Sequence, residues 1–242
     1  MELNVEHILF IDVETVPQYA SYAEVPATVK KWWEKKSDYF RTAGQSPEDA
    51  YERAGIWAEF GRIVCISAGF IYRRNGQRTL RLKSFAGYDE KALLQDFCRL
   101  LERFFVKKKN ARLCAHNGKE FDFPYIARRL LINGLPLPEI LDVADRKPWE
   151  TPFLDTMAFW KFGDYKHFCS LELLTGVLNI PTPKDDIDGS QVASIYYRDG
   201  DLPRIVRYCE KDVQAVVQLL LRYKAQPPLD HVESTTYTDV EI

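Results

Sequence analysis

The segment "HILFIDVETV" (residues 7–16) runs from apolar residues directly into two acids. Residues Ile8 to Ile11 predict a strand that is buried on both faces. Side chains two residues apart on a strand project to the same face, so Asp12 and Glu14 should lie side by side. Neighbouring carboxylates repel each other, and burying either one is costly. A divalent cation that prefers hard oxygen ligands, Mg²⁺ or Mn²⁺, would offset both costs.

Two further acids occur in settings that suit the same site. Asp122, in "HNGKEFDFP", follows a second short buried strand (111–116) and opens a helix, where a role as N-cap would also explain it. Asp212, in "RIVRYCEKDVQAVVQLLLRY", lies four residues after Tyr208 on a predicted helix, so the two side chains share a face. For each acid alone, capping, an ion pair or plain exposure to solvent is the simpler explanation. The four together favour a metal site.

The rest of the pattern predicts an α/β fold. Strands are predicted at 7–13, 62–72 and 79–85, and the last two are joined through Asn75-Gly76, a strong hairpin signal. A helix should start at Asp89 as N-cap, and another should end at Gly134. A short strand near Phe153 and helices from about Thr156, at 170–178, at 189–197 and at 203–223 complete the order. This order predicts a mixed five-stranded sheet with helices on both faces.

Two segments stand apart from this pattern. Residues 17–60 predict an inserted pair of helices after the first strand, the second capped by Ser46 with Pro47 in its first turn. Residues 225–242 have no periodicity and carry four acids without any Lys or Arg, which predicts a disordered acidic tail. The sequence therefore predicts one domain over residues 1–224, with an insertion at 17–60.

Composition narrows the class of protein. The chain has 242 residues, 46% of them hydrophobic, and no apolar run approaches the roughly 20 residues of a membrane span. Five cysteines without a C-x-x-C pair, and an N-terminus unlike a signal peptide, predict a cytoplasmic protein with reduced thiols. The net charge is only −2, but residues 61–135 carry 16 Lys and Arg against 6 Asp and Glu. A basic region favours a polyanionic partner, although solvated helix ends would also explain it.

The segments "FIDVET", "HNGKEFDFPYI" and "YCEKD" resemble the three motifs of the DEDD superfamily of 3′–5′ exonucleases. The Tyr-x-x-x-Asp spacing resembles the tyrosine subclass. The whole pattern, including "SLELLTGVLNIPTPKDDIDGSQV" (170–192), resembles stand-alone predicted exonucleases related to the proofreading domain of family B DNA polymerases. This resemblance spans residues 5–223 and implies a ribonuclease H-like fold. The activity that it implies is 3′–5′ hydrolysis of single-stranded nucleic acid, DNA being favoured, to nucleoside 5′-monophosphates.

The resemblance also implies roles for particular residues. Two divalent ions, Mg²⁺ or Mn²⁺, would be held by Asp12, Glu14, Asp122 and Asp212, with Asp12 as the bridge. Tyr208 would orient the attacking water, unless it only packs on the core. Three residues are expected to contact substrate, each with a simpler alternative: Asn117 as a turn residue, Phe121 as a core aromatic, and Lys184 as a solvated lysine. His116 is expected to be a satisfied strand-end histidine, and Asp155 to be a helix cap.

Three other functions remain compatible with the sequence. The first is an exonuclease for RNA or short oligonucleotides, because nothing in the motifs recognises the 2′-hydroxyl. The second is a catalytically weak module that only binds nucleic acid, although such a module would be expected to lack one of the four carboxylates. The third is an adaptor that docks through the insertion, with Trp32, Trp33 and Trp57 as its contact residues.

Overall fold

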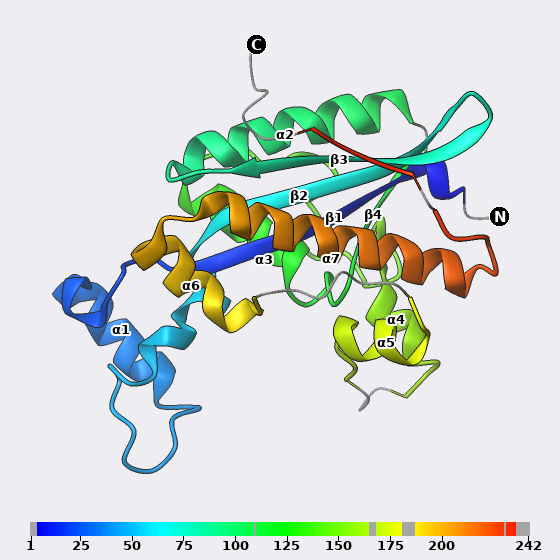
Figure 1. Ribbon diagram of the computed structural model, residues 1–242. Helices are drawn as coiled ribbons and strands as arrows, with labels where there is room; N and C mark the ends of the chain where they lie inside the picture. Colours follow the sequence, from blue (N-terminus) through cyan, green and yellow to red (C-terminus); the bar gives the residue numbers. More distant parts are fainter. Residues whose placement is uncertain (1–3, 109, 165–167, 181–186, 230, 236–242) are drawn as a thin grey trace.

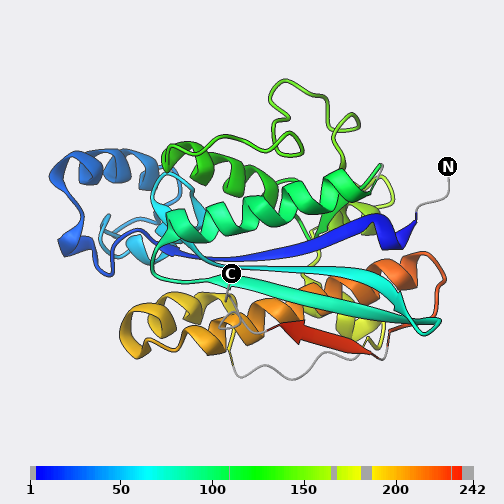
Figure 2. The same cartoon turned by 90° about the horizontal axis from the view of Figure 1, so that it is seen from above.

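A computed structural model describes residues 4–108, 110–164, 168–180, 187–229 and 231–235. It contains a mixed six-stranded sheet with helices on both faces (Figures 1 and 2). The strands are β1 (Ile8–Pro17), β2 (Gly61–Arg74), β3 (Gln77–Ala86), β4 (Arg112–Ala115), β5 (Phe153–Asp155) and β6 (Val232–Thr235). Their order in the sheet is β5-β4-β1-β2-β3-β6. No helix in the described ranges is long and apolar enough to cross a membrane.

The predicted meander forms the centre of this sheet. Strands β1, β2 and β3 pair antiparallel, and the β2–β3 hairpin turns at Asn75 and Gly76, both with positive φ. This conformation is the one that an Asn-Gly turn supplies. Strands β4 and β5 add to the β1 edge in parallel, and β6 adds to the β3 edge in parallel. The predicted mixed sheet is therefore confirmed, with six strands in place of five.

Helices cover the sheet in two layers, which Figure 2 shows from above. Helices α2 and α3 lie on one face, where they pack against Leu9, Ile11 and Val13 of β1. Helix α7 lies on the other face, where it packs against Ile8 and Phe10. The seven α-helices of the described chain are α1 (Ala27–Ser37), α2 (Glu90–Lys107), α3 (Asp122–Ile132), α4 (Thr156–Trp160), α5 (Leu171–Val177), α6 (Val192–Ser194) and α7 (Leu202–Tyr223).

Local signals account for the ends of several helices. Asp89 caps α2 by accepting a hydrogen bond from the Ala92 N–H (3.1 Å), as predicted. Ser170 and Asp201 cap α5 and α7 in the same way. Gly134 follows α3 with φ 66°, the left-handed conformation that ends many helices. These contacts use backbone donors and acceptors that a helix end leaves without an intrahelical partner.

The insertion after β1 is folded around aromatic side chains. Trp33 of α1 is fully buried, and its Nε1 donates to the Pro47 carbonyl (2.7 Å). Its indole packs edge-on against rings that come from other parts of the insertion: Phe40, Tyr51, Trp57 and Phe60. The insertion is tied to the domain by the hydrogen bond from the Tyr125 hydroxyl of α3 to the Gly55 carbonyl (2.7 Å), and its two ends are joined by the hydrogen bond from the Gln18 N–H to the Phe60 carbonyl (2.8 Å).

A buried ion pair fastens the same region to α2 and α3. The Arg129 guanidinium of α3 donates to the Glu90 carboxylate of α2 (Nε to Oε1, 2.8 Å), and both side chains are almost fully buried. Arg129 also donates to the Ala58 carbonyl (2.8 Å) at the end of the insertion. Glu90 accepts further hydrogen bonds from the Ile63 N–H (2.7 Å) and the Asn133 side chain (3.1 Å). The charges are thus paired and hydrogen-bonded, as burial requires.

Two sequence predictions about the insertion and the following helices are corrected. The predicted second helix of the insertion is a turn at Ser46 followed by a 3₁₀ helix at Tyr51–Ile56. Here the Gly55 backbone lies directly against Val16, and a Cβ at Gly55 would come within 2.9 Å of the Val16 carbonyl carbon. The helix predicted at 189–197 is divided into a 3₁₀ turn, α6 and a π-helical turn at Ile195–Asp199.

The prediction of a fully disordered tail is also wrong for the part that the structure describes. Residues Val232–Thr235 form β6, which makes the strand count six. Glu233 holds this strand in place by accepting hydrogen bonds from the Tyr72 hydroxyl (2.6 Å) and the Arg74 guanidinium (2.7 Å). The open edge of β3 thus supplies backbone hydrogen-bond partners for β6, and the nearby Arg74 pairs with Glu233. The short, polar sequence of this segment does not by itself reveal those partners. Residues 236–242 lie outside the described ranges.

Candidate active site

The two acids of β1 continue the strand face that packs on α7. Ile8 and Phe10 face α7, and alternation places Asp12 and Glu14 on the same side. The β1–β2 register shifts between Glu14 and Thr15, so a bulge lies next to the acids. Bulges re-aim side chains and are frequent beside active sites. The sequence predicted the shared face of the acids but gave no sign of the bulge.

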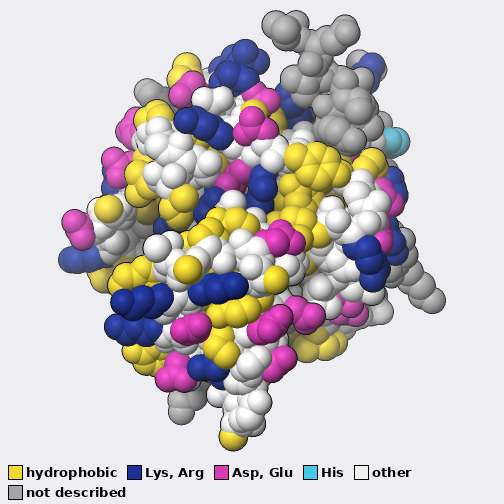
Figure 3. Space-filling model, turned by 90° about the vertical axis from the view of Figure 1, so that its left-hand side faces the viewer, with side chains coloured by type: hydrophobic (Ala, Val, Ile, Leu, Met, Phe, Trp, Pro, Cys, Tyr) yellow, Lys and Arg dark blue, Asp and Glu magenta, His cyan; other side chains and the backbone are white. Residues whose placement is uncertain are grey.

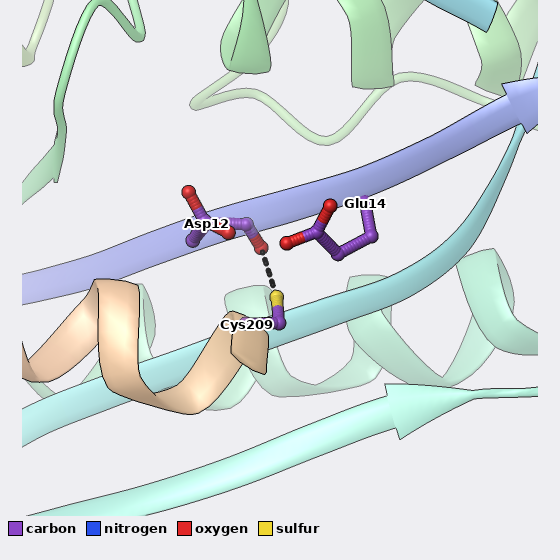
Figure 4. A group of neighbouring side chains, drawn as sticks. All are labelled: Asp12, Glu14 and Cys209. Carbon is purple, nitrogen blue, oxygen red and sulfur yellow. Dashed lines mark hydrogen bonds between the residues drawn. The ribbon is translucent and has the colours of Figure 1, made fainter. Parts of the chain in front are cut away.

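Helix α7 brings a third side chain to these acids. Figure 4 shows Asp12, Glu14 and Cys209 pointing toward one another from β1 and α7. One potential ligand atom from each lies within 4.8 Å of the others. The Cys209 thiol donates a hydrogen bond to the Asp12 backbone carbonyl (3.4 Å). Burial raises the pKa of the Cys209 thiol well above its usual range.

Asp122 reaches the group from the other side of β1. Strand β4 pairs with β1 only as far as Phe10, and β1 continues beyond it. The segment after β4 leads to α3, and Asp122 is the first residue of that helix. The Asp122 carboxylate accepts a backbone hydrogen bond from Val13, between the two acids of β1. Asp122 is only 4% exposed, and Phe121, not Asp122, occupies the N-cap position.

The pKa shifts reflect how closely the four acids lie. Burial raises the pKa of Asp12 well above its usual value, and the charges of Asp212, Glu14 and Asp122 raise it further. The pKa of Glu14 is raised by burial and then by Asp212. Burial also raises the pKa of Asp122 to about 7, although backbone hydrogen bonds oppose the rise. Each acid thus interacts electrostatically with the others.

In the described part of the chain, no Lys or Arg offsets this repulsion at three of the acids. Among the described residues, no ion pair joins a Lys or Arg to Asp12, Glu14 or Asp122. Buried carboxylates without such a partner are costly unless they are protonated or bound to a cation. The donor set consists of hard oxygen atoms, which suits Mg²⁺ or Mn²⁺. The residues present therefore fit a divalent metal site.

The chain also matches a known protein family. A family described as a predicted 3′–5′ exonuclease related to the exonuclease domain of PolB matches residues 56–240. The chain belongs to this family. The matched residues include Asp122, Tyr208 and Asp212, whereas Asp12 and Glu14 precede them. The fold of this exonuclease-family member brings the two earlier acids to the matched part.

Asp155 positions the loop between β4 and α3. Its carboxylate caps α4, as predicted, by accepting from the Met157 and Ala158 N–H groups (2.9 and 3.1 Å). It also accepts from the Asn117 and Lys119 N–H groups (both 3.1 Å). The same carboxylate therefore fixes both the start of α4 and the loop that leads to Asp122.

Asn117 has an unusual environment within this loop. Its φ is 61°, a left-handed conformation that Asn tolerates better than most residues. Its side-chain Oδ1 is buried and has no hydrogen-bond partner among the described residues. His116, next to it, is a satisfied histidine as predicted, with Nδ1 2.9 Å from the Thr156 hydroxyl and Nε2 2.9 Å from the Cys169 carbonyl. Because a carbonyl only accepts, Nε2 carries the proton.

The remaining predicted residues have different surroundings. Tyr208 lies on α7 one turn before Asp212 and is half-buried against the apolar cluster that contains Val16 and Cys209. Phe121 is half-buried, packs against the core and contacts the Tyr125 ring (centroids 5.2 Å apart). The core-packing alternative therefore accounts for Phe121. Lys184 lies outside the described residues.

Proposed function

We propose that this protein is a 3′–5′ exonuclease that hydrolyses single-stranded DNA and releases nucleoside 5′-monophosphates. The observation that carries the proposal is the convergence of Asp12, Glu14, Asp122 and Asp212, from β1, α3 and α7, in a member of a family of predicted 3′–5′ exonucleases. Acids that share one small, buried site repel one another and lose their hydration, which is costly to a fold. Metal-dependent phosphodiester hydrolysis needs carboxylates gathered in this way, which explains why the fold keeps them despite the cost.

The proposed fold is ribonuclease H-like. Its support is the order of the first five strands, β5-β4-β1-β2-β3, with β1 to β3 antiparallel and β4 and β5 parallel to β1. Helices on both faces and acids near the end of the central strand also support it. In this proposal, β6 and the α1 insertion are additions to the common core.

The four carboxylates would hold two divalent ions, with Asp12 between them. When bound, the ions supply an activated water and stabilise the charge that develops on the phosphate and on the leaving oxygen. The protein contributes carboxylates that are already gathered and desolvated, so few side chains need to be ordered when the ions bind. Cys209 contributes no ligand but fixes α7 against β1 through its bond to the Asp12 carbonyl.

Other residues would position the substrate. The unpartnered Oδ1 of Asn117 is a buried acceptor that suits a hydroxyl group of the terminal nucleotide. Asp155 holds the Asn117 backbone and so sets the place of this acceptor. The Tyr208 hydroxyl would orient the attacking water. In this proposal the hydroxyl positions the water through a hydrogen bond, and the metal site activates the water.

A gel time course tests the direction of attack. With Mg²⁺ or Mn²⁺, we expect stepwise shortening of a 5′-labelled single strand and immediate release of a mononucleotide from a 3′-labelled one. Cleavage should be slower on blunt duplex, should weaken with added salt, and should cease in EDTA. A matched RNA oligomer run in parallel compares the two substrates. Cuts within a circular single strand would contradict the proposal, because they need no free 3′ end.

The variant Tyr208→Phe tests the role of the hydroxyl. It removes one hydrogen bond and keeps the four carboxylates, so we expect the rate to fall by about 10²–10³-fold at most, as for the loss of one transition-state donor. Substrate affinity should change little. Single-turnover kinetics with a saturating oligonucleotide measure the step directly. A Phe variant as fast as wild type would make Tyr208 a packing residue, and one without any activity would make its hydroxyl a direct participant in proton transfer.

A further inference from the structure

The insertion after β1 carries an exposed aromatic and cationic face. Trp32, Lys35, Lys36 and Tyr39 recur three and four residues apart on α1 and in the turn that follows it. We call these four residues the α1 platform. Trp32 is 60% exposed and Tyr39 is 84% exposed. With Val29, Glu59 and Phe60, the platform lines a groove of about 530 Å³.

The α1 platform lies on an element that is otherwise well packed. The other rings of the insertion are packed around Trp33, which is fully buried. Trp32, the residue directly before Trp33 on α1, projects away from that cluster into the groove. An ordered helix that presents large aromatic side chains to solvent indicates a binding surface. The geometry therefore calls for a partner with flat, apolar faces.

The charge of α1 selects the class of partner. Helix α1 carries Lys30, Lys31, Lys35 and Lys36 against one acid, Glu34. Among the described residues, none of these lysines forms an ion pair, and Glu34 accepts a hydrogen bond from Tyr22. Figure 3 shows the side of the molecule on which α1 lies, where Lys and Arg, together with Asp and Glu, are interspersed among hydrophobic side chains. Aromatic rings for stacking, flanked by cations for phosphates, are the combination by which proteins hold single-stranded nucleic acid.

The position of the insertion connects this surface to the acids. Residues 17–60 leave β1 three residues after Glu14 and return at β2. Gly55 fixes the insertion against Val16 of β1 and, through the Tyr125 hydroxyl, against α3, the two elements that carry Asp12, Glu14 and Asp122. The insertion that carries the platform and the acid site are thus supported by the same two elements, β1 and α3.

We propose that the α1 platform holds the upstream nucleotides of a single-stranded substrate, with bases stacked on Trp32 and Tyr39 and phosphates beside Lys35 and Lys36. This inference rests on the proposed nuclease function and adds a second contact that only longer strands reach. It gives the enzyme a preference for strands long enough to span both places. The platform reads no base edges, so the preference is independent of sequence.

Binding measurements without cleavage test the platform separately from catalysis. In EDTA, the variant Trp32→Ala should bind a 20-nucleotide deoxythymidine strand at least about fivefold more weakly than the parent protein, since stacking contributes about 1–3 kcal/mol per base. Trp149→Ala is the matched control, because Trp149 is also exposed (76%) and also lies beside a lysine, Lys147, but belongs to the loop after α3. The control should bind like the parent. Equal affinity of Trp32→Ala and Trp149→Ala would overturn the proposal.

Salt dependence tests the lysines. Each phosphate contact on a single strand contributes about 0.7 to the slope of log K against log salt. The double variant Lys35→Ala, Lys36→Ala should therefore lower the magnitude of that slope by about 1.4. Alanine keeps the helix, because its helix propensity exceeds that of lysine. Lys107→Ala on α2 is the control, and an unchanged slope in the double variant would remove the lysines from the platform.

Cleavage of two substrate lengths separates this inference from the proposed function. Wild type should cleave a trinucleotide, which tests the acid site, and should have a higher kcat/KM for the 20-nucleotide strand. In Trp32→Ala, the ratio of the two kcat/KM values should fall toward one. If the trinucleotide is cleaved but the 20-nucleotide strand has no advantage, the platform is wrong and the nuclease proposal remains. If no substrate is cleaved, the nuclease proposal fails, and the binding data still decide the platform.

Discussion

We expect Asp12→Asn to abolish cleavage and to leave the fold intact. Burial raises the pKa of Asp12, and the charges of all three other carboxylates raise it further. Replacing its carboxylate with an amide removes both negative charge and ligand capacity, so the loss should exceed the roughly 10²–10³-fold expected for one hydrogen bond. Asp212→Asn should behave in the same way. Turnover of a labelled strand at saturating Mg²⁺ measures the effect.

Stability measurements show whether the loss is chemical or structural. In EDTA, the melting temperature of Asp12→Asn should equal or exceed that of wild type, because one of several repelling carboxylates has been removed. The control is Asp142→Asn, which changes an exposed acid in the loop after α3 and should alter neither activity nor stability. Near-wild-type turnover of Asp12→Asn would rule out its role as a metal ligand.

The second large effect concerns the buried pair between α2 and α3. Arg129→Met should lower the free energy of unfolding by about 3–5 kcal/mol, because it leaves the Glu90 carboxylate buried without its cation. In a protein of this size, that loss corresponds to a fall in melting temperature of about 6–20 °C. Urea unfolding followed by circular dichroism measures the change. The exposed neighbour gives the control, Arg128→Met, which should change stability by less than about 0.5 kcal/mol.

A double variant separates lost charge pairing from lost packing. Combining Glu90→Gln with Arg129→Met removes both charges, so much of the stability lost in the single Arg129 variant should return. Gln still offers an acceptor to the Ile63 N–H, which Glu90 now satisfies. If the double variant is as unstable as Arg129→Met, the contacts of the guanidinium with the Ala58 carbonyl and Gln18 matter more than the ion pair.

The sequence predicted the elements whose signals are local. The Asn75-Gly76 turn and the Asp89 cap both describe interactions within a few residues, and both are confirmed. The failures involve distant partners. Strand β6 forms because the β3 edge and the cations near Glu233 are available, and the Tyr51–Ile56 turn forms because Gly55 lies against Val16. No short window of sequence contains those contacts.

The predictions about the candidate site also divide into local signals, which the sequence reveals, and contacts with distant elements, which it does not. Alternation along β1 predicted that Asp12 and Glu14 share a face, and the fold confirms that they lie together with Asp122 and Asp212. The bulge after Glu14, the thiol contact of Cys209 and the unpartnered Oδ1 of Asn117 were not predicted. The first two depend on contacts of β1 with β2 and with α7, which are distant in the sequence, and residue types and spacing do not specify them.

Strand β6 has a consequence for the handling of this protein. It covers the outer edge of β3, from Leu80 to Lys83, which would otherwise present a row of unpaired backbone N–H and C=O groups. Such an edge is a template for strands of other molecules and promotes aggregation. Removing the acidic C-terminal residues to simplify purification would expose this edge in every copy of the chain. The last strand therefore protects solubility, whereas the acids that the proposal makes catalytic lie elsewhere in the sheet.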